Sequence, residues 1–214
     1  MQRSPLSWLY WLLFVGCVGL AVLLNLRWPG LPEPDPGALL RDNWFLWGFN
    51  YFGLLLMPVA ALLIDDARRK NMRWPIYVVP FFVVGILALS VYMARRPAND
   101  RVKRDTPLIL EQRWVWWLLL IGLVVISIIF LPNGSLAQLI DTMSKNLGLA
   151  FMWLDIVLNH IVALPLARAD MQRRGIAQQS QTIWLIAILL TGPIALCIYM
   201  ATRPAATGPA TIRE

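Results

Sequence analysis

The stretch Gly85-Ile-Leu-Ala-Leu-Ser-Val-Tyr-Met-Ala-Arg-Arg-Pro97 returns 107 residues later as Gly192-Pro-Ile-Ala-Leu-Cys-Ile-Tyr-Met-Ala-Thr-Arg-Pro204. Eight of the thirteen positions are identical, where chance would give about one at typical residue frequencies. Each copy closes a long apolar run with a tyrosine and, four residues later, an arginine. This similarity indicates an internal duplication.

The similarity extends over most of the chain. The first apolar run aligns with the fourth through shared Trp, Leu and Gly positions, and an Asp-x-x-Arg-basic pattern occurs at both 66–70 and 170–174. We therefore divide the chain into two units. Residues 1–105 form a first three-helix repeat with its loop, and residues 106–214 form a second repeat with a short C-terminal tail.

The composition is that of a membrane protein, with 58% hydrophobic residues, only 14% charged residues and eleven tryptophans. A bilayer core about 30 Å thick needs about 20 apolar residues in a helix. Six runs are long enough, and the sequence therefore predicts an all-α, polytopic membrane bundle of six transmembrane helices. The runs are 4–26, 43–64, 74–94, 114–140, 146–167 and 175–202.

Three crossings per repeat would insert the second repeat upside down relative to the first. The predicted arrangement is thus an inverted repeat. With six crossings, however, eight Lys and Arg residues fall on one face and eleven on the other, which is a weak bias for a membrane protein. A chain in which one run fails to cross would instead give a parallel arrangement.

Polar residues inside the apolar runs are the first candidate site. Asp155 is the only carboxylate well inside a run, and burying it is costly, so it is a functional candidate by default. Asn159 follows on the same helix face, whereas His160 is rotated by about 140° and faces another neighbour. Tyr51 aligns with Asp155 across the repeat, and Asn50 precedes it. These residues either bind a ligand or clamp the helices together.

The ends of the runs supply a second group, formed by Asp170, Arg174, Tyr199 and Arg203. As structural residues they would be loop ion pairs and interfacial anchors. As functional residues they would form a polar rim that binds the oxygenated end of a lipid-like ligand.

The second half resembles the small membrane-protein family linked to neoxanthin formation in plants, the abscisic-acid-deficient type, and related bacterial membrane proteins. The resemblance covers about a third of the chain and implies a carotenoid or other isoprenoid ligand. It also implies an isomerisation without a redox cofactor, in which Asp155 would act as acid or base. The shared positions are Asp155, Asp170, Arg174, Gly175, Gly192, Pro193, Leu196, Tyr199 and Arg203.

Other function classes are excluded or left as alternatives. A single histidine excludes many-histidine di-iron sites, and no nucleotide-binding loop or cysteine cluster is present, so we expect no metal and no cofactor. The net charge of +7 lies beside apolar runs and indicates contact with membrane lipids rather than nucleic acid. The alternatives are a proton-coupled inverted-repeat transporter and an accessory subunit or assembly factor of a membrane complex. We also expect a homo-oligomer or a larger membrane complex. The expected location is a bacterial inner membrane or a photosynthetic membrane.

Overall fold

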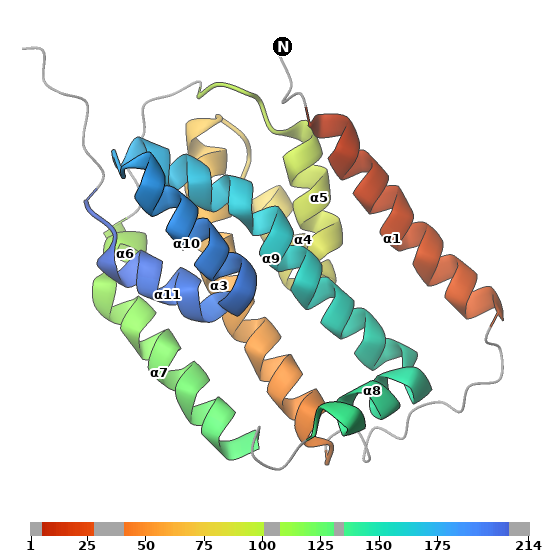
Figure 1. Ribbon diagram of the computed structural model, residues 1–214. Helices are drawn as coiled ribbons and strands as arrows, with labels where there is room; N and C mark the ends of the chain where they lie inside the picture. Colours follow the sequence, from red (N-terminus) through yellow and green to blue (C-terminus); the bar gives the residue numbers. More distant parts are fainter. Residues whose placement is uncertain (1–5, 28–40, 101–107, 131–134, 206–214) are drawn as a thin grey trace, which may run out of the picture.

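The computed structural model describes residues 6–27, 41–100, 108–130 and 135–205, and within these ranges the chain forms ten α-helices and no strand (Figure 1). The all-helical prediction is confirmed. The helices of the first half are α1 (Ser7–Arg27), α3 (Asn43–Arg69), α4 (Pro75–Val84) and α5 (Ile86–Arg95). Those of the second half are α6 (Leu108–Glu111), α7 (Arg113–Phe130), α8 (Leu136–Lys145), α9 (Leu147–Arg173), α10 (Gln178–Thr191) and α11 (Pro193–Thr202).

Three helices of the described chain, α3, α7 and α9, are long and apolar enough to cross a membrane. The third apolar run of each half is not one long helix but two short ones. Helices of ten residues, such as α4, α5 and α11, extend about 15 Å, which is half of a bilayer core. The described chain therefore does not contain six helices that are each long enough to cross a bilayer.

The break in the first half lies at Gly85. Its backbone angles are φ 47° and ψ −118°, a region that only glycine occupies readily. The chain turns back at this residue, because α4 starts just after the end of α3 and α5 ends with Arg96 bonded to Asp66 of α3. Both ends of the α4–α5 hairpin therefore lie at the same end of the molecule.

The second half repeats this hairpin. Gly192 has φ 51° and ψ −112°, and Pro193 starts α11 at the first helical position, where its missing N–H is not needed. Arg203, just after α11, bonds to Asp170 near the end of α9. In Figure 1, α10 and α11 form the two legs of this second hairpin.

The inverted arrangement predicted from the sequence is wrong. An ion pair of 2.8 Å joins Asp65, near the C-terminal end of α3, to Arg173 at the C-terminal end of α9. The two equivalent helix ends therefore lie side by side, and the two basic loops face the same way. The physical reason is the fold-back at the glycines, because the third apolar run of each half then forms a hairpin whose two ends lie at the same end of the molecule.

The two halves pack in matching ways, with one exception. Helices α3 and α9 pack together at the centre, α1 packs on α5 as α7 packs on α11, and each returning leg contacts the long helix of the other half. Helix α7 also packs closely on α3, where Trp47 Nε1 donates a hydrogen bond of 3.1 Å to Ser127 Oγ. Helix α1 does not pack on α9 to the same extent.

Replacing either hinge glycine by alanine should destabilise the protein by about 2–4 kcal/mol. Both glycines have positive φ, and a methyl group would meet the Asp155 carboxylate at Gly85 or the His160 ring at Gly192. Unfolding of the detergent-solubilised protein, followed by tryptophan fluorescence, measures the loss. Gly16→Ala in α1 is the control, because nothing lies within 4 Å of the added methyl group. Equal stability of the hinge variants and this control would contradict the requirement for glycine at the two turns.

Candidate functional site

A buried carboxylate, that of Asp66, lies near the C-terminal end of α3, and the residue is 1% exposed. Its Oδ2 accepts a hydrogen bond from Tyr92 Oη at 2.5 Å, and Arg96 donates to both carboxylate oxygens, from Nε at 2.6 Å and from Nη2 at 2.7 Å. Charge-assisted, bidentate contacts of this kind are among the stronger hydrogen bonds in proteins. They hold the returning leg α5 against the end of α3.

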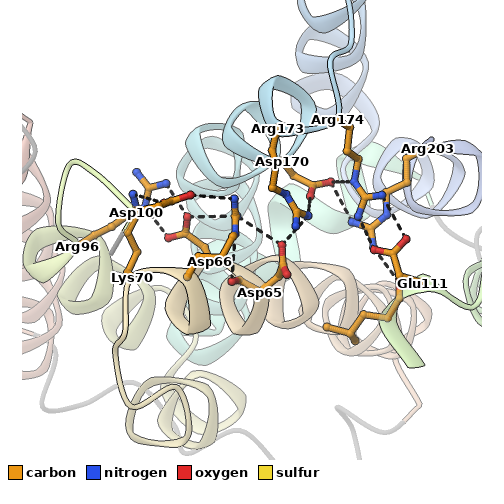
Figure 2. Close-up of polar contacts among 12 residues, drawn as sticks. Asp65, Asp66, Lys70, Arg96, Asp100, Glu111, Asp170, Arg173, Arg174 and Arg203 are labelled. Atoms are coloured by element: carbon orange, nitrogen blue, oxygen red, sulfur yellow. Dashed lines mark hydrogen bonds and ion pairs between the residues drawn. The ribbon is translucent and has the colours of Figure 1, made fainter. Parts of the chain in front are cut away.

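The second half builds the same arrangement on Asp170, also 1% exposed. Its Oδ2 accepts from Tyr199 Oη at 2.6 Å, from Arg203 Nη1 at 2.9 Å and from Arg174 Nε at 2.9 Å. All four residues that the sequence predicted for the polar rim thus lie in one cluster, shown in part in Figure 2. Their part in ligand binding stays a prediction.

Glu111 completes this second cluster and was not among the site residues predicted from the sequence. Its carboxylate accepts hydrogen bonds from Arg174 Nη2 at 2.6 Å and Nη1 at 3.2 Å. Partial burial alone would raise the pKa of Glu111, but the Arg174 and Arg203 guanidinium groups lower it below its ordinary value. The only available signal was a lone acid directly before the apolar run of α7.

The clusters of the two halves join in one continuous layer (Figure 2). Arg173 links them through its ion pairs with Asp65 and Asp170. At the other edge, Asp100 pairs with Lys70 at 2.8 Å and with Arg69 at 3.5 Å. Because most of these side chains are buried, the layer fixes the relative position of the two long helices and both hairpins.

Asp155 lies on α9 opposite the first hinge. Its Oδ1 accepts the backbone N–H of Ile86 at 2.7 Å and the Asn159 side-chain amide at 3.0 Å. The N–H of Ile86 is one of the donors that the start of helix α5 leaves without a partner inside the helix. In the second half the corresponding residue is Pro193, which has no N–H to satisfy. This difference explains why one half needs a carboxylate and the other does not.

The residues aligned with this site lie at the second hinge instead. Tyr51 Oη donates to the Thr191 carbonyl at 3.2 Å and lies 3.4 Å from His160 Nε2. The prediction that Asp155 and His160 face different neighbours is confirmed. The Asn50 side-chain amide donates to the Leu46 carbonyl of its own helix at 2.8 Å, and its part in ligand binding stays a prediction.

Asp155 also borders an apolar cavity of about 470 Å³. The cavity lies between α1, α3, the first hinge and α9, and Asp155 is the only charged residue among the described residues that line it. A second apolar cavity, of about 710 Å³, continues along α1 and α9. Cys17, Leu154 and Leu158 line both cavities, so we treat them as one feature, the α1–α9 groove.

No protein-family model, curated protein sequence or solved structure matches this chain. The resemblance to the neoxanthin-linked family therefore stays a prediction. The geometry of the cluster and of the groove carries the functional interpretation that follows.

We predict that Glu111→Gln lowers the free energy of unfolding by about 1.5 kcal/mol at pH 7, because a neutral amide binds Arg174 less strongly. A lowered folded-state pKa means that the unfolded protein takes up the proton more readily, so this stabilisation is present above the unfolded pKa and lost on acidification. The difference from the unsubstituted protein should narrow below about pH 4.3.

Unfolding curves between pH 3 and pH 7 measure this difference. Asp141→Asn is the control, because Asp141 forms an exposed pair with Lys145 and its loss should cost under about 0.5 kcal/mol. If the effect of Glu111→Gln on the free energy of unfolding stays constant or grows on acidification, the ionised Glu111 carboxylate is not the source of the stabilisation.

Proposed function

We propose that the chain is a multi-pass integral membrane protein that binds an isoprenoid-type lipid in the α1–α9 groove. Four helices, α1, α3, α7 and α9, would cross the bilayer, and the two hairpins would enter it from one face and return to that face. Helix α1 has 21 residues, about 31 Å of helix, which suffices for a crossing. Large apolar side chains are exposed along the outer faces of α1 and α7, as expected against lipid.

The distribution of charge supports this topology. We call the end of the molecule at which α3, α5, α9 and α11 end the hairpin end. Eleven Lys and Arg residues of the described chain lie there, and only three lie at the other end. By the positive-inside rule the hairpin end would face the cytoplasm. The eleven are Arg68, Arg69, Lys70, Arg73, Arg95, Arg96, Arg113, Arg168, Arg173, Arg174 and Arg203, and the three are Arg27, Arg41 and Lys145.

The proposal rests on the one place where the two halves pack differently. Where α7 closes on α3, the corresponding pair α1 and α9 leaves an elongated apolar groove. Pockets for small apolar ligands are concave and mostly apolar, with few polar groups. A long hydrocarbon chain fits this shape and chemistry, and a lipid can enter from the bilayer without crossing water.

The sequence accounts for the opening. In the closed pair, Trp47 donates a hydrogen bond to Ser127. At the offsets of 104 and 106 residues that relate the two halves, the corresponding residues are Phe151 and Ala21. Phenylalanine and alanine side chains cannot form that hydrogen bond, and both residues line the groove. The duplicated unit is thus sealed in one half and open in the other.

Asp155 has two roles in this proposal. Its carboxylate accepts the Ile86 N–H at the start of α5, the helix whose first residues form one wall of the groove. Among the described residues it is also the one acid that lines the groove, where it would protonate a polyene in the predicted isomerisation. The transporter alternative depended on an inverted repeat, and the parallel arrangement removes that support. Nothing in the described chain favours the accessory-subunit alternative over lipid binding.

Filling the groove should weaken lipid binding. Cys17 lines both cavities, so Cys17→Phe should weaken saturable binding of tritiated geranylgeraniol, a C20 isoprenoid alcohol, by at least about tenfold, since the added ring occupies the ligand's volume. The assay uses the full chain in phosphatidylcholine nanodiscs. Asp155→Asn should bind within about twofold of the unsubstituted protein, because an asparagine Oδ1 can still accept the Ile86 N–H.

Val22→Phe is the matched control, because Val22 lies on the same helix, is 52% exposed and does not line either cavity. It should bind as the unsubstituted protein does. Absence of saturable binding, or equal losses in Cys17→Phe and Val22→Phe, would overturn the proposal.

A further inference from the structure

A third cavity, of about 630 Å³, lies at the hairpin end of the molecule. Among the described residues, five basic residues line it and only one acid does, Asp100. The five come from three parts of the chain that meet there, the ends of α3, α5 and α9: Arg69, Lys70, Arg96, Arg168 and Arg173. We refer to it as the basic cavity.

Three of the carboxylates that pair with these cations do not line the basic cavity. Asp65, Asp66 and Asp170 are at most 3% exposed and pair with arginines in the layer of Figure 2. The fourth, Asp100, lines the cavity and pairs with Lys70 and Arg69. Arg168 stands apart, because it is exposed and makes no ion pair with the described part of the chain. Apart from Asp100, the charged groups that the described chain places in the cavity wall are therefore cationic N–H donors, and their other carboxylate partners are buried behind the wall.

The basic cavity adjoins the α1–α9 groove. Pro165 lines both, and on α9 the groove residues lead directly from Leu158 through Leu164 to Arg168 and Gln172. Asp155 lies ten residues before Pro165, about 15 Å along the helix. A single amphiphile could thus place an anionic head in the basic cavity and its chain in the groove, with the far part of the chain beside Asp155.

We propose that the ligand is an isoprenoid phosphate, whose phosphate group binds in the basic cavity. This inference rests on the proposed function and adds the head group to it. A phosphate presents several acceptor oxygens in different directions, which suits donors that converge from three helix ends. A carboxylate or a hydroxyl would engage fewer of them. Asp100, at 48% side-chain exposure, opposes the anion and lowers its affinity.

Geranylgeranyl phosphate and geranylgeraniol, which differ only in the phosphate, provide the test. In phosphatidylcholine nanodiscs the phosphate should bind the full chain at least about tenfold more tightly than the alcohol. Arg168→Gln should reduce the affinity for the phosphate about three- to tenfold and leave that for the alcohol unchanged. Asp100→Asn should increase the affinity for the phosphate, because it removes the one acid of the wall.

Arg113→Gln is the matched control, since Arg113 is also an exposed arginine at the hairpin end but does not line the basic cavity. It should leave both affinities unchanged. Equal affinity for phosphate and alcohol would overturn this inference while leaving the proposed function intact, whereas binding of neither would overturn both.

Two competitors distinguish the sources of phosphate. Inorganic phosphate should compete only at concentrations at least about a hundredfold higher, because it lacks the chain that the groove binds. Competition by dioleoyl phosphatidic acid as strong as that by unlabelled geranylgeranyl phosphate would overturn the assignment to isoprenoids.

Discussion

The buried carboxylate at the end of each long helix is the interaction on which the rest of the structure depends. Asp66 and Asp170 each bind the tyrosine and arginine that close the returning leg of a hairpin. Breaking a buried pair of this kind leaves an uncompensated charge and typically costs 3–5 kcal/mol. Without these contacts the hairpin ends would be held by helix packing alone, the two halves would lose much of their shared layer of ion pairs, and α5, which forms one wall of the groove, would be less firmly positioned.

The two halves use one architecture for different ends. In the second half a proline starts the returning leg and α7 is sealed against α3 by a tryptophan–serine hydrogen bond. In the first half an isoleucine N–H requires Asp155, and phenylalanine and alanine replace the sealing pair. Asp155 is therefore first of all a consequence of the missing proline. Its position beside the groove then makes it available to a bound chain.

Part of this could be predicted from the sequence, and the rest could not for physical reasons. Apolar composition predicted the helices, and the recurrence of Tyr92 and Arg96 at Tyr199 and Arg203 predicted equivalent ends. The length of an apolar run does not distinguish a crossing helix from a hairpin, so the orientation was missed. The signals were present, in a glycine at the middle of each third run and in a weak charge bias under the six-crossing arrangement. Glu111 and Asp100 have no periodic pattern, because their roles arise only from tertiary contact.

In the proposed topology the two halves are parallel, and each hairpin returns to the face from which it entered the membrane. Labelling with a membrane-impermeant maleimide tests it, in vesicles of defined orientation and in a background without Cys17 and Cys197. Single cysteines introduced as Arg68→Cys, Gln172→Cys and Gln138→Cys report on the two basic loops and on α8. Parallel halves predict that the first two cysteines are labelled from one side of the membrane and the third from the other. Labelling of Arg68→Cys and Gln172→Cys from opposite sides would contradict it.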